Sequence, residues 1–280
     1  MLLNDILRED ELKDRLQALE KGQATLEQEN QEQLLHSMLA HIGSTNSELR
    51  DNLIYGSFYD WILEKNLLDH SRLTELLDFS MNNLLCKGIE ERESDLVFTR
   101  TFTSLLLALI LFRDHQDDFL SQHKLDDCKD KLLAYLAAEK DVRGYVTGKG
   151  WAHSVAHVSD AIDELVKNPK ISKETYVDFL HALWNMILRN DYVFIHNEDE
   201  RLLVPILTML EHGLEQQEII QLLLQIPITL MTQKSQLDLE HYRIILFNCK
   251  TLLKSFYIQT NGKLQYATLH QSIATCLSEL

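Results

Sequence analysis

The sequence predicts an all-α protein, and more finely a HEAT-like α-solenoid, an α-α superhelix of stacked helical hairpins. Apolar residues recur every three or four positions nearly from end to end, which is the period of amphipathic helices. The 280 residues include three prolines and nine glycines, so few positions interrupt a helix. No tract rich in Val, Ile and Thr alternates apolar and polar residues as a half-buried strand does.

Short polar segments divide the chain into a series of helices. The first two are expected at 3–19 and 25–42, where the polar run QATLEQENQEQLL forms an end cap of the solenoid or a partly mobile arm. Four hairpin pairs follow: 47–66 with 70–87, 95–113 with 126–139, 150–167 with 172–190, and 198–212 with 215–226. Helices at 238–257 and 264–279 complete the chain, and the last of them caps its other end.

A weak internal period supports this pairing. The segments ELRD, FTRTF, WAHSV and DERLL begin helices about fifty residues apart, slightly above the roughly 40–47 residues of a HEAT repeat, and a leucine-rich helix follows each. We therefore expect one elongated domain over 1–280, with an N-terminal cap at 1–45, repeats at 46–226 and a C-terminal cap at 227–280.

The period places four basic side chains at equivalent helix starts, namely Arg50, Arg100, His153 and Arg201. In a solenoid these side chains would lie next to one another along a single groove. The alternative is that they cap helix starts or join neighbouring repeats through carboxylates such as Asp51.

The net charge of −16 disfavours several classes of partner. Binding to a nucleic-acid backbone requires a stripe of Lys and Arg that displaces counterions, and the sequence contains no such stripe. The same charge disfavours an acidic partner or an anionic membrane surface. We expect no nucleic acid and no membrane among the partners.

The cysteines and the termini predict a soluble, cytoplasmic protein. Cys86, Cys128, Cys249 and Cys276 follow no CxxC spacing, so reduced thiols are expected rather than a disulfide framework. The N-terminus is acidic within ten residues and lacks the apolar core of a signal peptide. The longest apolar run, 105–112, is too short to span a bilayer.

Residues 141–165, DVRGYVTGKGWAHSVAHVSDAIDEL, form the most unusual segment of the chain. On a helix starting near Gly150, a wheel places His153, His157, Asp160 and Glu164 on one stripe. The apolar residues of the segment, Trp151, Val155, Val158, Ile162 and Leu165, lie on the opposite side. The two histidines are therefore expected outside the core.

The stripe has two interpretations. His153 and His157, with Asp160 one turn on, offer the ligands of a zinc, iron or manganese ion, and a further ligand would come from another repeat, for example His196 or Glu200. The alternative is a solvated or groove-facing surface, in which the histidines pair with nearby carboxylates. The segment is not the HExxH of zinc proteases, because Ser154 follows the first histidine.

The loop before the stripe suggests an anion site. Gly144, Gly148 and Gly150 allow main-chain N–H groups to approach a ligand closely, and Arg143 and Lys149 lie beside the expected helix N-terminus. Such a loop can hold a carboxylate or a phosphate. The alternative is that the glycines only turn the chain, while Arg143 bonds carbonyls or a carboxylate.

The run RGYVTGKGWAHSVAHVSDAIDEL resembles the RGYxxxKGWAHSxAHxxD signature of an uncharacterised bacterial family, a domain of unknown function. FTRTFTSLLLALIL and VFIHNEDERLLVPIL resemble its flanking segments, and the likeness spans about 35–225. The family is similar in pattern to HEAT-like repeat proteins, which implies a solenoid but no activity, substrate or cofactor. The resemblance marks Gly144 and Gly150 as positions to test, together with the six ligand-binding candidates Arg143, Lys149, Trp151, His153, His157 and Asp160.

Two functional hypotheses follow. The first is a binding or scaffold module that takes a protein or a small anionic ligand in a concave groove centred on 143–160. The second is a metal-dependent hydrolase: His153, His157 and Asp160 hold the ion, Arg143 and Lys149 neutralise an anionic substrate, and Glu164 or Glu200 acts as base. The sequence alone does not choose between them.

Overall fold

The protein is all-α, as predicted. The computed structural model describes residues 6–280, which hold twelve α-helices and one two-stranded sheet. The first residues of the helix expected at 3–19 lie outside this range. The described chain divides into two compact units, Met1–Leu165 and Val166–Leu280, and each is described by itself. The HEAT-like stacking and the single capped domain over 1–280 remain predictions.

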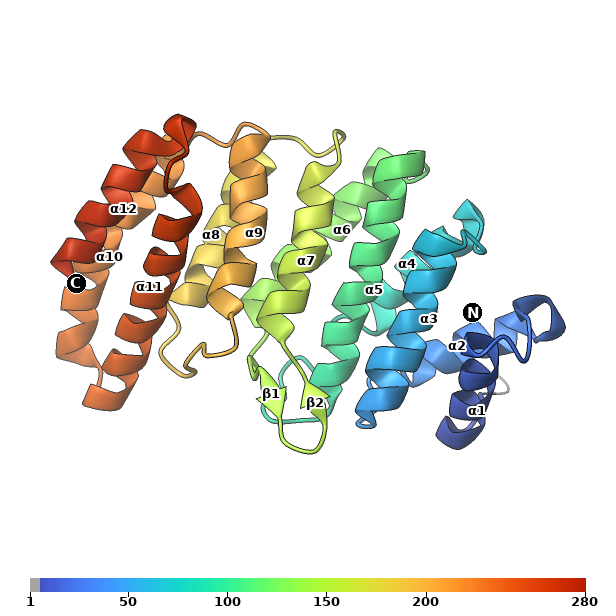
Figure 1. Cartoon of the computed structure of the whole chain (residues 1–280). Coiled ribbons are helices and arrows are strands. Elements are labelled where there is room, and N and C mark those ends of the chain that lie inside the picture. The colour runs from blue at the N-terminus through green and yellow to red at the C-terminus, as the bar shows by residue number, and fades with distance from the viewer. Residues whose placement is uncertain (1–5) are drawn as a thin grey trace. The chain divides into compact units, whose positions relative to one another are not determined.

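The first unit contains the elements α1 to α7 (Figure 1). In order they are α1 (Glu9–Glu20), η1 (Leu26–Gln28), α2 (Gln31–Ala40), η2 (Glu48–Tyr55), α3 (Gly56–Tyr59), η3 (Asp60–Glu64), α4 (His70–Asn83), α5 (Leu96–Asp117), α6 (Gln122–Ala138), β1 (Tyr145–Val146), β2 (Gly150–Trp151) and α7 (Ser154–Lys167). The last turn of α7 extends past the boundary into the second unit.

Helix α5 is the core of the first unit. It packs against α4, η2, α3 and η3, and its buried side chains lie around its whole circumference. Of the described helices, α5 is the one long and apolar enough to cross a membrane by length and composition. Its most apolar window is 83% buried inside the structure, as in the core helix of a soluble protein.

The segment expected as one α-helix at 47–66 has an irregular pitch. Its two ends, η2 and η3, are π-helices, and the short α3 lies between them. A π-helix holds an extra residue in its turn, is rare, and is often found at functional sites. Both sides of this segment are covered, because η2 contacts α1 and α5 contacts all three pieces.

A β-hairpin replaces the predicted start of the helix at 150–167. Tyr145 pairs with Trp151 and Val146 with Gly150, in antiparallel register. Gly148 (φ 77°) adopts the left-handed conformation in the turn, and Gly150 (φ 86°) adopts it at the start of β2. Helix α7 therefore begins at Ser154.

The second unit contains α8 (Thr175–Ile187), α9 (Glu198–Glu211), α10 (Gln216–Gln236), α11 (Leu239–Thr260), η4 (Leu264–Tyr266) and α12 (Ala267–Glu279). Helix α11 packs against α8, α9, α10 and α12 and forms the centre of this unit. The predicted end of a helix at 226 is wrong, since α10 continues through Pro227 to Gln236. Buried Ile226 and Leu230 on either side of the proline anchor both halves of α10.

Candidate functional site

The two arginines expected along a groove are instead fully buried. Arg50 and Arg100 have exposed fractions of 0%. Of the two interpretations offered by the sequence, the groove shared with His153 and Arg201 is therefore wrong for both arginines, and the ion pair of Arg50 with Asp51 fits the alternative. A guanidinium is tolerated in a core only where its donors find acceptors, so the partners explain the burial.

Arg50 joins η2 to the hairpin. Its Nη1 donates to the carbonyl of Ser44 (2.7 Å) and its Nη2 to the carbonyl of Lys149 (2.9 Å). Nε donates to the Asp51 carboxylate (2.7 Å). A Cβ at Gly150 would lie 3.0 Å from Nη2 of Arg50, so only glycine lets the hairpin approach this closely.

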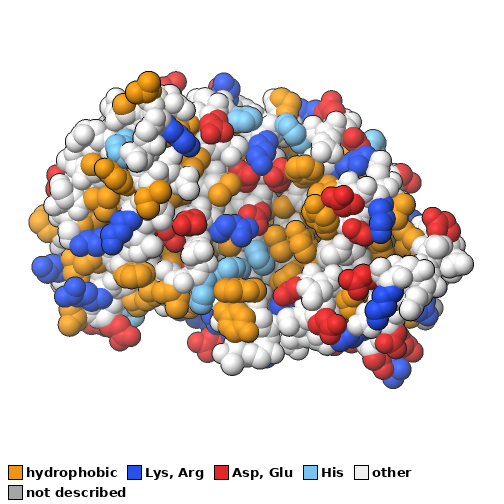
Figure 2. All heavy atoms as spheres, viewed as in Figure 1, with side chains coloured by type: hydrophobic (Ala, Val, Ile, Leu, Met, Phe, Trp, Pro, Cys, Tyr) orange, Lys and Arg blue, Asp and Glu red, His pale blue; other side chains and the backbone are white. Residues whose placement is uncertain are grey.

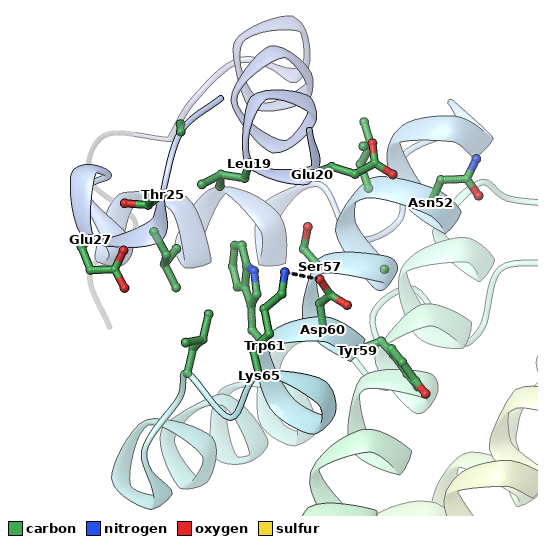
Figure 3. A pocket seen from close by; sticks show the side chains of 15 residues that line it. Leu19, Glu20, Thr25, Glu27, Asn52, Ser57, Tyr59, Asp60, Trp61 and Lys65 are labelled. Atoms are coloured by element: carbon green, nitrogen blue, oxygen red, sulfur yellow. Dashed lines mark hydrogen bonds and ion pairs between the residues drawn. The ribbon is translucent and has the colours of Figure 1, made fainter. Parts of the chain in front are cut away.

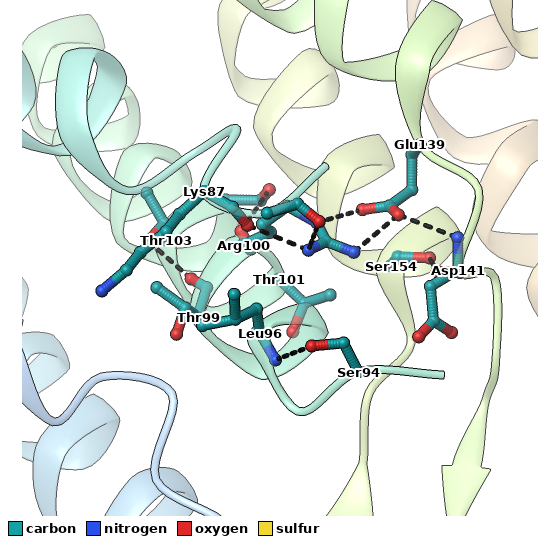
Figure 4. Close-up of polar contacts among 12 residues, drawn as sticks. Lys87, Ser94, Leu96, Thr99, Arg100, Thr101, Thr103, Glu139, Asp141 and Ser154 are labelled. Carbon is teal, nitrogen blue, oxygen red and sulfur yellow. Dashed lines mark hydrogen bonds and ion pairs between the residues drawn. The ribbon is translucent and has the colours of Figure 1, made fainter. Parts of the chain in front are cut away.

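Arg100 forms a buried ion pair with Glu139 (Figure 4). Nε and Nη2 donate to the two carboxylate oxygens at 2.7 and 2.8 Å, and Nη1 donates to the carbonyls of Lys87 and Gly88, both at 3.0 Å. The same carboxylate accepts the backbone N–H of Asp141 (2.9 Å). This network fixes the chain that leads from α6 into the hairpin.

Arg143 and Lys149 are engaged in pairs within the first unit. Arg143 Nη2 donates to the Asp141 carboxylate (2.6 Å) and to the carbonyl of Ser94 (3.1 Å). The Asp141 hydrogen bond raises the pKa of Arg143. Lys149 Nζ lies 2.6 Å from the Asp95 carboxylate. The cations expected to hold an anion are thus neutralised by carboxylates, and their geometry favours a structural turn.

The histidines do not share one helix. His153 precedes α7 with φ 48°, so its ring is not on the wheel that placed it with His157. His157 is on α7 but only 8% exposed, which corrects the expectation that it lies outside the core. Its ring packs edge-on against Phe102 at 5.4 Å. Trp151, expected in the core, is exposed on the hairpin and stacks on His153 at 4.4 Å.

The first unit gives no geometric support to a metal centre at His153, His157 and Asp160. Among its described residues, no three His, Cys, Asp or Glu side chains bring ligand atoms within 4.8 Å of one another. His196 and Glu200 belong to the second unit. Ser154 is buried, and its hydroxyl donates to the carbonyl of Asp141 (2.7 Å).

Asp160 and Glu164 instead line a groove between the α3–η3 segment, α5 and α7. Its volume is about 510 Å³. The apolar and aromatic side chains of its lining come from the end of η2, from α3–η3 and from α5: Tyr55, Tyr59, Leu63, Leu105, Ala108, Leu109 and Phe112. Tyr59 and Phe112 are themselves exposed. Figure 2 shows carboxylates in the middle of the visible face, with apolar side chains and also Lys or Arg side chains near them.

The charges of this carboxylate groove all have one sign. Asp160, Asp163 and Glu164 of α7 and Glu64 of η3 line it, and no Lys or Arg does. The hydroxyl of Tyr59 donates to Oε1 of Glu64 (3.0 Å), and this hydrogen bond raises the pKa of Tyr59. The lining of the groove thus combines apolar and aromatic side chains with carboxylates.

Sequence reasoning identified Asp160 and Glu164 but not the aromatic side chains that line the groove with them. Tyr55, Tyr59 and Phe112 lie far from the 141–165 segment in sequence and carry no motif of their own.

Comparison with known proteins places the chain in a family. Residues 85–258, more than half of the chain, match the family model described as a protein of unknown function, DUF2785. This range begins later and ends later than the resemblance at 35–225. No curated protein and no solved structure matches the chain. The chain therefore belongs to the DUF2785 family of proteins of unknown function.

Proposed function

We propose that the protein is a binding module whose carboxylate groove takes a basic, partly apolar segment of a protein partner. The observation that carries this proposal is the lining of the groove: apolar and aromatic side chains, with carboxylates as the charged groups. A Lys or Arg side chain offers both an apolar stem and a cationic head, and so matches both parts of the lining.

The ligand charge differs from the anionic one expected from the sequence. Arg143 and Lys149, on which that expectation rested, are paired with Asp141 and Asp95. An anion entering the carboxylate groove would meet four residues of its own charge sign, Glu64, Asp160, Asp163 and Glu164. We therefore keep the hypothesis of a binding module but expect a cationic partner in place of an anionic one. The hydrolase hypothesis gains no observation in its favour.

The test uses a fluorescein-labelled peptide that alternates Lys with Leu and Phe, and a second peptide in which Glu replaces Lys. Fluorescence anisotropy measures the binding of each to the full chain. We expect the Lys peptide to bind and the Glu peptide not to bind. The affinity should fall with added salt, because exposed charges are screened over about 8–10 Å at physiological ionic strength.

General attraction to a protein of net charge −16 must be separated from binding in the groove. Phe112→Ala changes no charge but removes an apolar wall, and should weaken binding of the Lys peptide about five-fold or more. Asp160→Asn should weaken binding too, whereas Glu211→Asn on α9 of the second unit is the matched control. Unchanged affinity in Phe112→Ala would reduce the interaction to non-specific electrostatics and refute the proposal.

A further inference from the structure

A second cavity lies on the other side of the π-helical segment, between it and the N-terminal residues 19–27 (Figure 3). Its volume is about 590 Å³, within the roughly 300–1,000 Å³ of small-molecule sites. Leu19, Leu26, Leu53 and Leu67 supply apolar contacts to it. It is separate from the carboxylate groove except at Tyr59, which lines both.

Gly56 leaves the backbone open toward this cavity. It begins α3 with φ −58°, an ordinary helical value, so the conformation does not require glycine. A Cβ built on Gly56 would meet no atom within 4 Å, so packing does not require glycine either. Glycine inside a helix destabilises it by about 1 kcal/mol relative to alanine. The space kept beside Gly56 therefore has no structural explanation in the described chain.

Trp61 presents a donor without an acceptor. The side chain is only 4% exposed and lines the cavity, and Figure 3 shows its indole in the space between Lys65 and the 19–27 segment. Its N–H makes no hydrogen bond to any residue from 6 to 280. The N–H is not among the buried unsatisfied donors, so it is accessible from the cavity, where a ligand carrying an acceptor can replace water.

The charges of the lining exclude an anionic ligand. Lys65 Nζ lies 2.6 Å from the Asp60 carboxylate, and this pair is internally neutral. Glu20 and Glu27 also line the cavity, and neither pairs with a Lys or Arg between residues 6 and 280. The backbone N–H of Glu27 and the hydroxyl of Thr25 lower the pKa of Glu27, which keeps this carboxylate charged at neutral pH.

We propose that this cavity binds a small organic cation, a primary amine that carries an apolar body and one hydrogen-bond acceptor. The ammonium group faces Glu20 and Glu27, the acceptor receives the N–H of Trp61, and the body fills the leucine-lined space beside Gly56. The cavity is thus a second ligand site, whose existence does not depend on the carboxylate groove.

The test compares three compounds with the same phenyl body. Phenylalaninol is a cation at pH 7, N-acetylphenylalaninol is neutral, and N-acetylphenylalanine is an anion. Isothermal titration calorimetry on the full chain should show the tightest binding for phenylalaninol and none for the anion. Equal affinities for the three compounds, or no binding of phenylalaninol at 10 mM, would overturn the proposal.

Two variants locate the binding. Gly56→Leu should abolish phenylalaninol binding by filling the cavity. Trp61→Phe keeps an aromatic ring but loses the N–H, and should weaken binding about five-fold. Trp184→Phe, on α8 of the second unit, is the matched control and should bind as the wild type does. Undiminished binding in both Gly56→Leu and Trp61→Phe would refute the site.

Thermal denaturation of each variant checks the fold. Gly56→Ala should unfold at the same temperature as the wild type or higher, because alanine is the better helix former and its methyl group enters open space. If Gly56→Leu does not fold, Trp61→Phe and the three-compound series still decide the question.

Discussion

The guanidinium of Arg50 stacks on the Phe98 ring in the core of the first unit, 4.3 Å from the ring centroid. The same group donates to the carbonyls of Ser44 and Lys149. Burial lowers the pKa of Arg50, opposed by the charge and hydrogen bond of Asp51. Arginine nonetheless remains charged in proteins, so its buried donors need these acceptors.

Arg50→Lys should destabilise the fold although it conserves the charge. The ammonium group of lysine lacks the planar shape and the five donors of a guanidinium. It cannot donate to both carbonyls and stack on the Phe98 ring at the same time. We expect a loss of about 2–4 kcal/mol in the free energy of unfolding, measured by urea denaturation. Lys65→Arg, in an exposed pair, should change it by less than about 0.5 kcal/mol. Equal stability of Arg50→Lys and wild type would show that the fold does not need the planar guanidinium.

Removing one partner of the Arg100–Glu139 pair should be more damaging than removing the pair. Both side chains are at most 1% exposed. Glu139→Gln leaves a buried guanidinium without its counterion, and a loss of about 3–5 kcal/mol is expected. Urea denaturation measures this change. The exposed pair of Lys140 and Glu90 is the control, where Lys140→Ala should alter stability by under about 1 kcal/mol.

The two histidines of the 141–165 segment should respond differently to mutation. His157→Ala removes a buried ring from its contact with Phe102, so about 1–3 kcal/mol of stability should be lost. His153→Gly should be far milder, because glycine adopts a φ of 48° without strain. Thermal and urea denaturation of the separate variants test this. Equal losses would contradict the assignment of only His157 to the core.

Cys86 should be the one thiol that reacts in the folded protein. It is the exposed one of the four. Desolvation raises the pKa of Cys86 too, but burial raises the pKa of Cys128 and Cys249 to about 12 and that of Cys276 to about 11. Thiolates are the reactive form. Iodoacetamide at pH 8 should therefore add one carbamidomethyl group to native protein and four in urea, as counted by mass spectrometry. Two or more additions before unfolding would contradict the burial.

His241 should titrate above its ordinary value. The hydrogen bond and charge of Asp238 raise the pKa of His241 from 6.5. A raised folded-state pKa stabilises the protein fully below pH 6.5, and that contribution is lost as the pH rises through the folded-state pKa. NMR titration measures the pKa of the ring directly.

Asp238→Asn provides the control for this titration. Asparagine can still accept the backbone N–H of His241 and cap α11, but it removes the negative charge. The pKa of His241 should then return toward 6.5. A wild-type pKa at or below that value would show that the pair does not form in solution.

The sequence predicted the helices because burial follows their 3.6-residue period, as in α4 and α11, whose expected ranges differ from the observed ones by a few residues. It did not predict the hairpin, because strands of two residues are too short to alternate. It did not predict the π-helical turns either, because η2 and η3 keep the apolar spacing of an ordinary helix.

The candidate site was predicted less well, for a different reason. Charged residues were assigned to a groove by their type, but Arg50 and Arg100 find their acceptors far along the chain, at Lys149 and Glu139. Such pairings leave no local pattern. Asp160 does line a groove, but the aromatic residues opposite it come from helices distant in sequence.

The hydrogen bond from Arg50 to Lys149 sets an order on biosynthesis. It joins positions 99 residues apart, so it cannot form until Lys149 has left the ribosome. Until then the guanidinium has its local acceptors at Ser44 and Asp51 but lacks the one supplied by the hairpin. The first unit thus completes its core only after the glycine-rich hairpin has emerged. A nascent chain halted before that point should remain sensitive to protease even though its first six α-helices have been synthesised.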